Sequence, residues 1–476
     1  MIRISQDISR GIRPTSRWGG LLDPVSPGAP GGDRYAPSYD VIVNGNSLPD
    51  EVRQHITSIE YEDNEELFDK ITITLSGFFE DPVKGRTVTI CEWVQSDPIF
   101  SEGNLLWVLA GYGAFMNLLG GGEIVKREFN YGQNPSVVVT AYEPLHRMAG
   151  QFAEDAINYK SMRSSDIVKK IATKPAYSGK IGALFNTELI ETLPIFSPKP
   201  EVQKRGESDY AFIKRMADVR GWQLYTRFDI KSRKFNLYYG PDVDNQETLF
   251  RYEYNPPGEL YPEDAIFSFV PTITAIDQNT EVEITSIDEK RKKKVEQSRK
   301  YVAYGDGKKP VNRTFSGNNT SFKQGELQNP VSYRFEIFGV SKKIIATRPF
   351  KDESEVKKFV INWARETIKN FITGTLTIAG NESIQSRQNI YLFGLGETFS
   401  GSEGHPAKWY TSKVTHKLQV SGEMVYAIEA ELRKVIDWLP EGDLSANPPA
   451  IKKAQEVKSK FNRVKIIEKT KAEAGG

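Results

Sequence analysis

The stretch WYTSKVTHKLQVSGEMVYAIEAELR, residues 409–433, decides the fold class because apolar residues recur at alternate positions on both sides of a short turn. This period of two is typical of antiparallel strands that bury one face. The first strand places Tyr410, Val414, Leu418 and Val420 on one face, and after Ser421-Gly422 the second returns with Met424, Tyr426, Ile428, Ala430 and Leu432. The pattern predicts a β-hairpin in a mainly β chain.

Residues 39–148 show the same period closer to the N-terminus. The expected buried faces carry Thr57, Ile59 and Tyr61, then Ile71, Ile73 and Leu75, then Val88 and Ile90, and finally the run Val137–Thr140. Glycines, above all Gly120-Gly121-Gly122, are expected to separate the strands. This segment therefore predicts one small all-β barrel or sandwich.

Residues 149–240 mix helical and strand patterns and predict a small α/β module. Ser164-Ser165-Asp166 can cap a short helix, and Ser208 is the expected N-cap of a better-marked one. Gly221 stands where a left-handed residue ends a helix, and Trp222 begins the following hairpin. We expect structural roles for these three residues: cap for Ser208, stop for Gly221 and core anchor for Trp222.

The strand period resumes over residues 241–440. The run DEKRKKKVEQSRK at 288–300 and the polar stretch after it interrupt the period, and we interpret residues 288–332 as a solvated insertion. A helix is expected from about residue 352 to residue 370, with Gly374 as its stop.

Both ends of the chain differ from the segments between them. Residues 1–38 are rich in Pro and Gly and predict an extended arm, either without fixed structure or docked as a strand on a neighbouring subunit. Residues 441–476 form a linker and a basic tail, which is either an amphipathic helix laid on a partner or a frayed end. The residues proposed for partner contact are Lys452, Lys453, Phe461 and Arg463.

Composition excludes several classes of function. The 476 residues hold 63 Lys plus Arg and 62 Asp plus Glu, so the net charge of +1 argues against a protein that clamps nucleic acid. The single cysteine, Cys91, excludes an internal disulfide and a cysteine-rich zinc site. No apolar window is long enough for a membrane-spanning helix, and the first residues lack the apolar core of a secretory signal.

No motif nominates a catalytic, cofactor-binding or metal-binding residue. The four histidines lack the spacing of a metal site, and Cys91 is expected in mid-strand with a structural role. The glycines from Gly394 to Gly401 are expected to form a turn between strands without opening a helix. His416 is interpreted as a barrel histidine with both ring nitrogens satisfied. Carboxylate pairs of the kind that cleave glycosides stay open, because distant residues form them, and we select none.

Three places in the chain carry a family resemblance. They are GRTVTI (85–90) with GGEIVKR (121–127) and TAYEPL (140–145), then ESDYAFIKRMA (207–217) ending at Gly221-Trp222, and WYTSKVTH (409–416) with the hairpin that follows. In this order they resemble the baseplate hub family of contractile phage tails, the late-control D proteins, and the N-terminal half of VgrG spike proteins. The resemblance covers about residues 39–437, and the arm, the insertion and the tail depart from it.

The resemblance implies a mainly β chain with two tube-type antiparallel β-barrels, residues 39–148 and 241–440, and a small α/β domain between them. It further implies a homotrimer in the virion baseplate, assembled in the host cytoplasm, that joins the six-fold tail tube protein to a three-fold spike. Genomic DNA would pass through its channel only in transit, and wedge proteins are further expected partners. The chain carries no run of short β-helix repeats after the hub segments, so the spike is expected to be a separate chain.

Three other functions stay open at this point. The same ring could serve as the hub of a phage-like contractile injection particle. A tail-associated cell-wall hydrolase and a carbohydrate-binding receptor protein are alternatives from other classes. Physical reasoning favours the hub, because open barrels leave sheet edges that only pairing with sister subunits would close.

Overall fold

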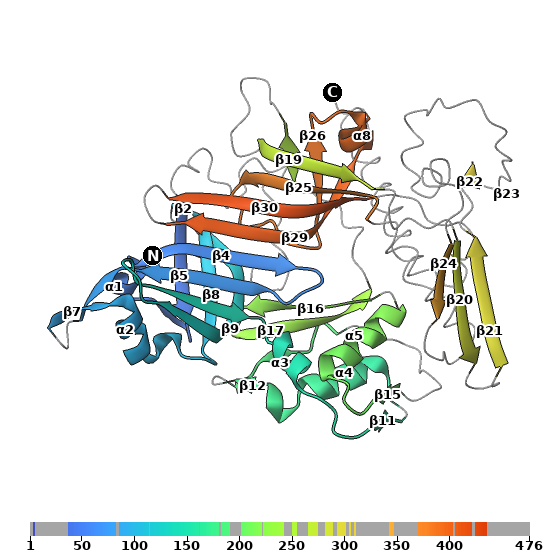
Figure 1. Ribbon diagram of the computed structural model, residues 1–476, viewed down its shortest axis with the longest axis horizontal. Helices are drawn as coiled ribbons and strands as arrows, with labels where there is room; N and C mark the ends of the chain where they lie inside the picture. Colours follow the sequence, from blue (N-terminus) through green and yellow to red (C-terminus); the bar gives the residue numbers. More distant parts are fainter. Residues whose placement is uncertain are drawn as a thin grey trace, which may run out of the picture. The chain divides into compact units, whose positions relative to one another are not determined.

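We describe the fold from a computed structural model (Figure 1). The structure describes residues 3–4, 37–81, 85–113, 115–160, 162–179, 182–190, 201–220, 222–241, 250–254, 265–274, 281–288, 293–300, 304–305, 309–310, 342–346, 370–402, 405–420 and 424–435. These residues fall into two compact units. One holds the described residues up to Thr274 and from Asn370 onward, and the other holds most of those between 281 and 346.

A large, mostly antiparallel sheet dominates the first unit. Its main path is β19 (Ile266–Ile273), β25 (Ile372–Ala379), β30 (Val425–Lys434), β29 (Lys408–Gln419), β4 (Ile56–Asn64), β5 (Lys70–Ser76), β10 (Ser136–Tyr142), β9 (Phe115–Asn130), β8 (Leu105–Tyr112), β2 (Pro37–Val43) and β3 (Asn46–Ser47). Beside this path, β1 (Arg3–Ile4) pairs with β9, β26 (Asn389–Phe393) with β29, and β18 (Arg251–Glu253) with β26. The expectation of a mainly β fold is confirmed.

The two predicted strand sets share this sheet. Strand β29 of the C-terminal hairpin pairs antiparallel with β4 of the first set, with Val414 opposite Asp63 and Leu418 opposite Ile59. Figure 1 shows the orange strands β29 and β30 continuing the layer of the blue strands β4 and β5. Among the described strands the path ends at β19 and β3 and does not close on itself.

Alternating burial explains why these segments form strands. In β5, Ile71, Ile73 and Leu75 are at most 1% exposed, while the residues between them are half-buried threonines. Every residue of β8 is buried, so this strand is covered on both faces. Trp107 of β8 meets Phe228 of the next module, with ring centroids 5.1 Å apart.

The glycine run at 120–122 does not separate strands, contrary to our expectation. All three glycines lie inside β9. A Cβ atom on Gly120 would lie 2.3 Å from the Tyr61 ring, and one on Gly121 would lie 2.8 Å from the Phe228 ring. The glycines therefore let two aromatic side chains press directly against the strand.

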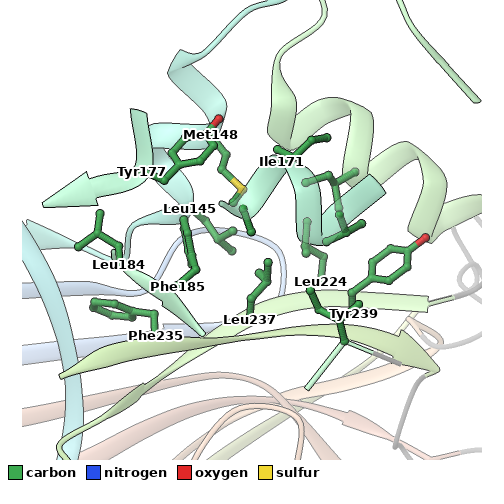
Figure 2. Close-up of a cluster of buried hydrophobic side chains, with 14 of the residues drawn as sticks. Leu145, Met148, Ile171, Tyr177, Leu184, Phe185, Leu224, Phe235, Leu237 and Tyr239 are labelled. Carbon is green, nitrogen blue, oxygen red and sulfur yellow. The ribbon is translucent and has the colours of Figure 1, made fainter. Parts of the chain in front are cut away.

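A small α/β module follows β10. Helices α3 (Leu145–Gly150), α4 (Ser164–Ala172) and α5 (Asp209–Arg220) cover a sheet of β14 (Phe185–Asn186), β17 (Lys234–Pro241) and β16 (Trp222–Asp229). Shorter elements complete the module: β11 (Ile157–Tyr159) with β15 (Glu201–Gln203), the 3-10 turn Pro175–Tyr177, and β12 (Ser178–Gly179) with β13 (Gly182–Ala183). Figure 2 shows Leu224, Leu237 and Tyr239 of the hairpin facing the helices, which pack Leu145, Met148 and Ile171 against them.

The remaining elements are short. In the first unit they are α1 (Asp50–Arg53), the hairpin β6 (Phe78–Asp81) and β7 (Arg86–Thr89), α2 (Ile90–Ser96), the 3-10 turn Pro98–Phe100, α8 (Glu397–Ser400), and β27 (Gly401–Ser402) with β28 (His405–Pro406). Separately, β21 (Lys293–Lys300), β20 (Glu281–Asp288) and β24 (Lys342–Ala346) form a three-stranded sheet, and β22 (Tyr304–Gly305) pairs with β23 (Lys309–Pro310).

Several local predictions are wrong, each for a physical reason. The strand expected through Ile90 and Cys91 ends at Thr89, because the Thr89 hydroxyl accepts a hydrogen bond from the backbone N–H of Glu92 at 3.1 Å and caps α2. This is the helix-start pattern of threonine followed three residues later by glutamate. Ser164 and Ser165 lie inside α4 and make no cap hydrogen bond, since Arg163 occupies the N-cap position.

Two further corrections concern the second strand set. The helix expected over residues 352–370 lies outside the described residues except for Asn370, and its expected stop, Gly374, lies within β25, where a Cβ atom would come 2.6 Å from the Phe269 ring. Gly396, with φ of 79°, begins the short helix α8, so the glycine cluster does open a helix. Within residues 288–332, interpreted above as a solvated insertion, residues 293–300 form strand β21.

Candidate functional site: a charged junction and an open sheet edge

The structure describes two of the three predicted structural residues. The hydroxyl oxygen of Ser208 accepts a hydrogen bond from the backbone N–H of Ala211 at 3.1 Å, directly before α5. Trp222 begins β16, and its ring meets Tyr239 edge-on at 5.1 Å between centroids. Gly221 and the proposed contact residues of the tail, Lys452, Lys453, Phe461 and Arg463, lie outside the described residues.

Neither Cys91 nor His416 forms a reactive group. The Cys91 thiol is buried, donates toward the carbonyl oxygens of Asn130 and Ser136, and has its pKa raised by burial. Burial lowers the pKa of His416 to about 4, so the ring is neutral at pH 7. Its Nε2 donates to the Ile384 carbonyl oxygen at 2.9 Å, which leaves Nδ1 to accept from the Tyr426 hydroxyl at 2.8 Å.

A buried group of charged side chains is the most distinctive feature of the first unit. We call Asp63, Asp69, Glu143, Arg227 and Arg387 the junction cluster. Asp63 is the second-last residue of β4, Asp69 precedes β5, and Glu143 follows β10. Arg227 lies in β16, and Arg387 lies in the loop of residues 380–388. The cluster thus joins the first strand set, the α/β module and the second strand set.

Asp63 is the centre of the junction cluster, with its side chain fully buried. Its Oδ2 lies 3.0 Å from Arg227 Nη1 and accepts from the Ser386 backbone N–H at 3.0 Å, while Oδ1 lies 3.5 Å from Arg387 Nη1 and accepts from the Ser386 hydroxyl. Burial alone would raise the pKa of Asp63, but the two guanidinium groups outweigh it and hold the pKa well below its usual range. Asp63 therefore stays ionised.

Arg387 has an unusual backbone that aims its side chain into the junction. Its φ is 64°, in the left-handed region that is costly for a non-glycine residue. Its Nη2 donates to the backbone oxygens of Asn64 and Glu65 at 2.9 and 3.2 Å, and its guanidinium lies 4.5 Å from the centroid of the Tyr225 ring. The strained loop is held by these contacts to β4 and β16.

The carboxylates of Asp69 and Glu143 have fewer stabilising contacts with positive charges and hydrogen-bond donors than the carboxylate of Asp63. Asp69 accepts from the Tyr61 hydroxyl and the Asn64 backbone N–H, each at 3.1 Å, and its Oδ2 lies 3.5 Å from Arg227 Nη1. Glu143 is 4% exposed and accepts from the Thr226 hydroxyl. Burial, together with the neighbouring carboxylates, raises the pKa of Asp69 well above its usual range, and burial raises the pKa of Glu143 to about 7.

A second ion pair reinforces the same junction. Glu65 lies 3.1 Å from Arg433 Nη1 of β30 and accepts from the Tyr410 hydroxyl of β29 at 3.1 Å. The Arg433 guanidinium lies 4.1 Å from the centroid of the Tyr410 ring. The loop after β4 is thereby tied to the C-terminal hairpin.

A pocket of about 100 Å³ borders the junction cluster. Asp69, Glu143 and Arg227 line it, together with Tyr61 and Gln385. Within the described part of the chain, His, Cys, Asp and Glu side chains form no group that could hold a metal ion. The contacts of the junction cluster connect the first strand set, the α/β module and the second strand set.

The open sheet edge is the second candidate feature. Among the described strands β19 pairs only with β25, and Phe267 and Val270 of β19 are 55% and 62% exposed. Phe269, the neighbour of Val270 in β19, packs edge-on against Trp409 at 5.1 Å between ring centroids. Pro271 lacks a backbone N–H and suits an edge position. At the other end of the sheet, β3 covers only Ile42 and Val43 of β2.

Reasoning from the sequence did not identify the junction cluster. One signal was present, because extending the face of Ile59 and Tyr61 by two residues places Asp63 on the buried side of the strand. A carboxylate in that register predicts a buried partner. Arg227 and Arg387 had no comparable local signal, since their partners lie in distant segments.

No helix among the described residues has the length and apolar character needed to cross a membrane. A scan against protein-family models finds no match, and a search of curated proteins finds none.

Solved structures, by contrast, resemble the chain over most of its length. The tail protein from Neisseria meningitidis MC58 is 11% identical with a TM-score of 0.57, and the match covers 86% of this chain and 99% of that protein. The 43 kDa tail protein of prophage MuSo2 from Shewanella oneidensis is 10% identical with a TM-score of 0.54, covering 83% of this chain and 98% of that protein. The chain therefore has the fold of phage tail proteins, and the resemblance to the tail hub family that its motifs predict is confirmed at the level of fold.

Proposed function

We propose that this chain is a structural hub of a contractile phage tail baseplate. Three copies would form a ring that joins the six-fold tail tube to a separate three-fold spike and leaves a channel for the genome. Each copy would contribute two tube-type strand sets, residues 39–148 and 241–440, so that three copies supply six similar units. The role is mechanical, and we assign no catalytic residue.

The open edge at β19 is the observation that carries this proposal. A strand that pairs on one side only among the described strands, with exposed Phe267 and Val270, invites pairing with another chain, because natural proteins rarely leave such an edge uncovered. The other end of the sheet offers the partly bare edge of β2. Pairing between sister copies would cover these edges. In a closed ring, the backbone N–H and C=O groups of every such edge would find partners. The fold shared with phage tail proteins supports the same conclusion.

The decisive experiment is mass measurement of the purified chain combined with electron microscopy and symmetry averaging. We expect three copies per particle and a central hole. A well-behaved monomer, or a particle without a hole, would overturn the proposal.

Lysine at the exposed edge should prevent assembly. In the Val270→Lys variant, an exposed apolar side chain of β19 becomes a charge that opposes strand pairing. We expect the far-ultraviolet circular dichroism spectrum to stay unchanged while light scattering shows loss of the trimer. The matched control is Val425→Lys, since Val425 is 52% exposed but lies in β30, which pairs with β29. If both variants assemble like the wild type, β19 is not the subunit interface.

We also propose that the tail, residues 441–476, contacts a spike or wedge protein through Lys452, Lys453, Phe461 and Arg463. Eight Lys and Arg against three Glu between residues 451 and 473 suit an acidic partner surface. A chain truncated after residue 440 should still form trimers but fail to retain the spike in a pull-down from reconstituted baseplates. Retention of the spike by the truncated chain, at the level of the full chain, would refute this contact.

A further inference from the structure

The charges of the junction cluster do not balance. It holds three carboxyl groups and two guanidinium groups, so full ionisation would leave one excess negative charge among buried side chains. A buried charge without a partner is costly, and the usual relief is to keep a proton. The count of charges therefore predicts that the junction cluster binds one proton.

The contacts show which carboxyl groups can hold that proton. Asp63 accepts two hydrogen bonds from Ser386 and faces both arginines, so its charged form is stabilised. Asp69 faces Arg227 at 3.5 Å, and Glu143 accepts from the neutral Thr226 hydroxyl. The backbone N–H of Glu143 also donates to the Asp69 carbonyl oxygen at 3.1 Å, which keeps these two residues side by side. The Asp69–Glu143 pair is thus the site of the proton, and burial raises the pKa of both groups.

Most of the groups that surround the cluster within the described residues are neutral or already paired with an opposite charge. Among the described residues, the other titratable or charged groups around the cluster are Tyr61, Glu65, His146, Tyr210, Tyr225, His416 and Arg433, and His146 Nδ1 donates to the backbone carbonyl oxygen of Glu143 at 2.8 Å. Burial raises the pKa of Tyr61 and Tyr210, so they stay neutral, and His416 is neutral above a pKa of about 4. Glu65 and Arg433 neutralise each other at 3.1 Å.

The pocket gives the proton a route to solvent. Asp69, Glu143 and Arg227 all line this space of about 100 Å³, which is large enough for water molecules. The carboxyl pair can therefore exchange its proton with the surrounding water without unfolding of the sheet.

We propose that the junction cluster is a pH-dependent clasp between three parts of the fold. With the proton bound, the neutral cluster holds β16 and the loop of residues 380–388 against β4 and β5. Loss of the proton adds an unpaired negative charge and loosens the junction. This property belongs to the single chain and does not depend on the hub function.

The sign of the effect follows from proton linkage. An unfolded glutamate has a pKa of about 4.3, whereas the folded chain keeps the proton on Glu143 up to a pKa of about 7. Between these values the folded state binds more protons than the unfolded state, so stability falls as the pH rises. One proton changes the unfolding equilibrium constant by up to about tenfold per pH unit.

The test is chemical denaturation of the full chain across the range from about pH 5 to pH 8. We expect the wild type to lose stability as the pH rises, and Glu143→Gln, which mimics the protonated group, to lack that slope. The matched control is Glu123→Gln: Glu123 is also buried but forms a one-to-one pair with Arg147 at 2.6 Å, so we expect the slope to survive there.

Two outcomes would overturn the clasp. One is a wild type without the slope, and the other is a slope that survives in both Glu143→Gln and Asp69→Asn. If the variants fail to fold, infrared spectroscopy of the folded wild type decides the question. A protonated carboxyl band at about pH 6 that disappears toward pH 8 supports the proposal, and its absence at both values contradicts it.

Discussion

Replacing Asp63 with alanine should destabilise the chain by about 3–5 kcal/mol, because it breaks a buried ion network from one side. The change leaves the guanidinium groups of Arg227 and Arg387 without their shared carboxylate. It also removes the acceptor for both the backbone N–H and the hydroxyl of Ser386. The measurement is the midpoint of chemical denaturation at pH 7.

The control for Asp63→Ala is its neighbour in the same strand. Glu62 points to the opposite face, is 20% exposed, and pairs with Lys70 and, at 3.4 Å, with Lys413. Ion pairs near the surface contribute about 1 kcal/mol or less, so Glu62→Ala should cost far less than Asp63→Ala. Similar losses in the two variants would show that the junction cluster does not hold the three parts together.

The Trp409→Ala variant should lose about 3–5 kcal/mol, the usual cost of removing a large aromatic side chain from a core. Trp409 is fully buried, and its Nε1 donates to the Phe399 carbonyl oxygen at 2.8 Å. Its ring also supports Phe269, and so holds β19 in place at the edge of the sheet. Denaturation measures the loss, and faster hydrogen exchange in β19 and β25 locates it.

Trp409→Phe separates packing from the hydrogen bond. Phenylalanine keeps an aromatic ring beside Phe269 but cannot donate to the Phe399 oxygen, so the loss should be smaller than in Trp409→Ala. Equal losses in the two variants would mean that the aromatic contact contributes little. Unchanged exchange in β19 would show that this strand does not depend on Trp409.

Elements with a regular apolar period could be predicted from the sequence. The hairpin of residues 409–433 is β29 and β30, with Val414 opposite Ala430 as a period of two requires. The period does not reveal the register shift between Thr411 and Lys413. At this shift the Thr411 hydroxyl donates a hydrogen bond to the Gln385 carbonyl oxygen, in the loop of residues 380–388, at 2.8 Å. Such detail depends on a neighbour distant in sequence.

The glycines show a second limit of local reasoning. Gly120, Gly121 and Gly374 suggest breaks when only their chain neighbours are considered, yet all three lie inside strands. Each provides room for an aromatic ring from another segment. The junction cluster was missed for the same reason, since its partners meet only after the strands have paired.

The pairing of β4 with β29 has a consequence for synthesis of the protein. Ser386 and its partner Asp63 are 323 residues apart, and β29 lies still farther along the chain. On the ribosome, β4 therefore emerges long before β29, the strand that will pair with one of its edges. That edge stays unpaired for most of translation. Nascent chains are therefore expected to be prone to aggregation until the final hairpin leaves the exit tunnel.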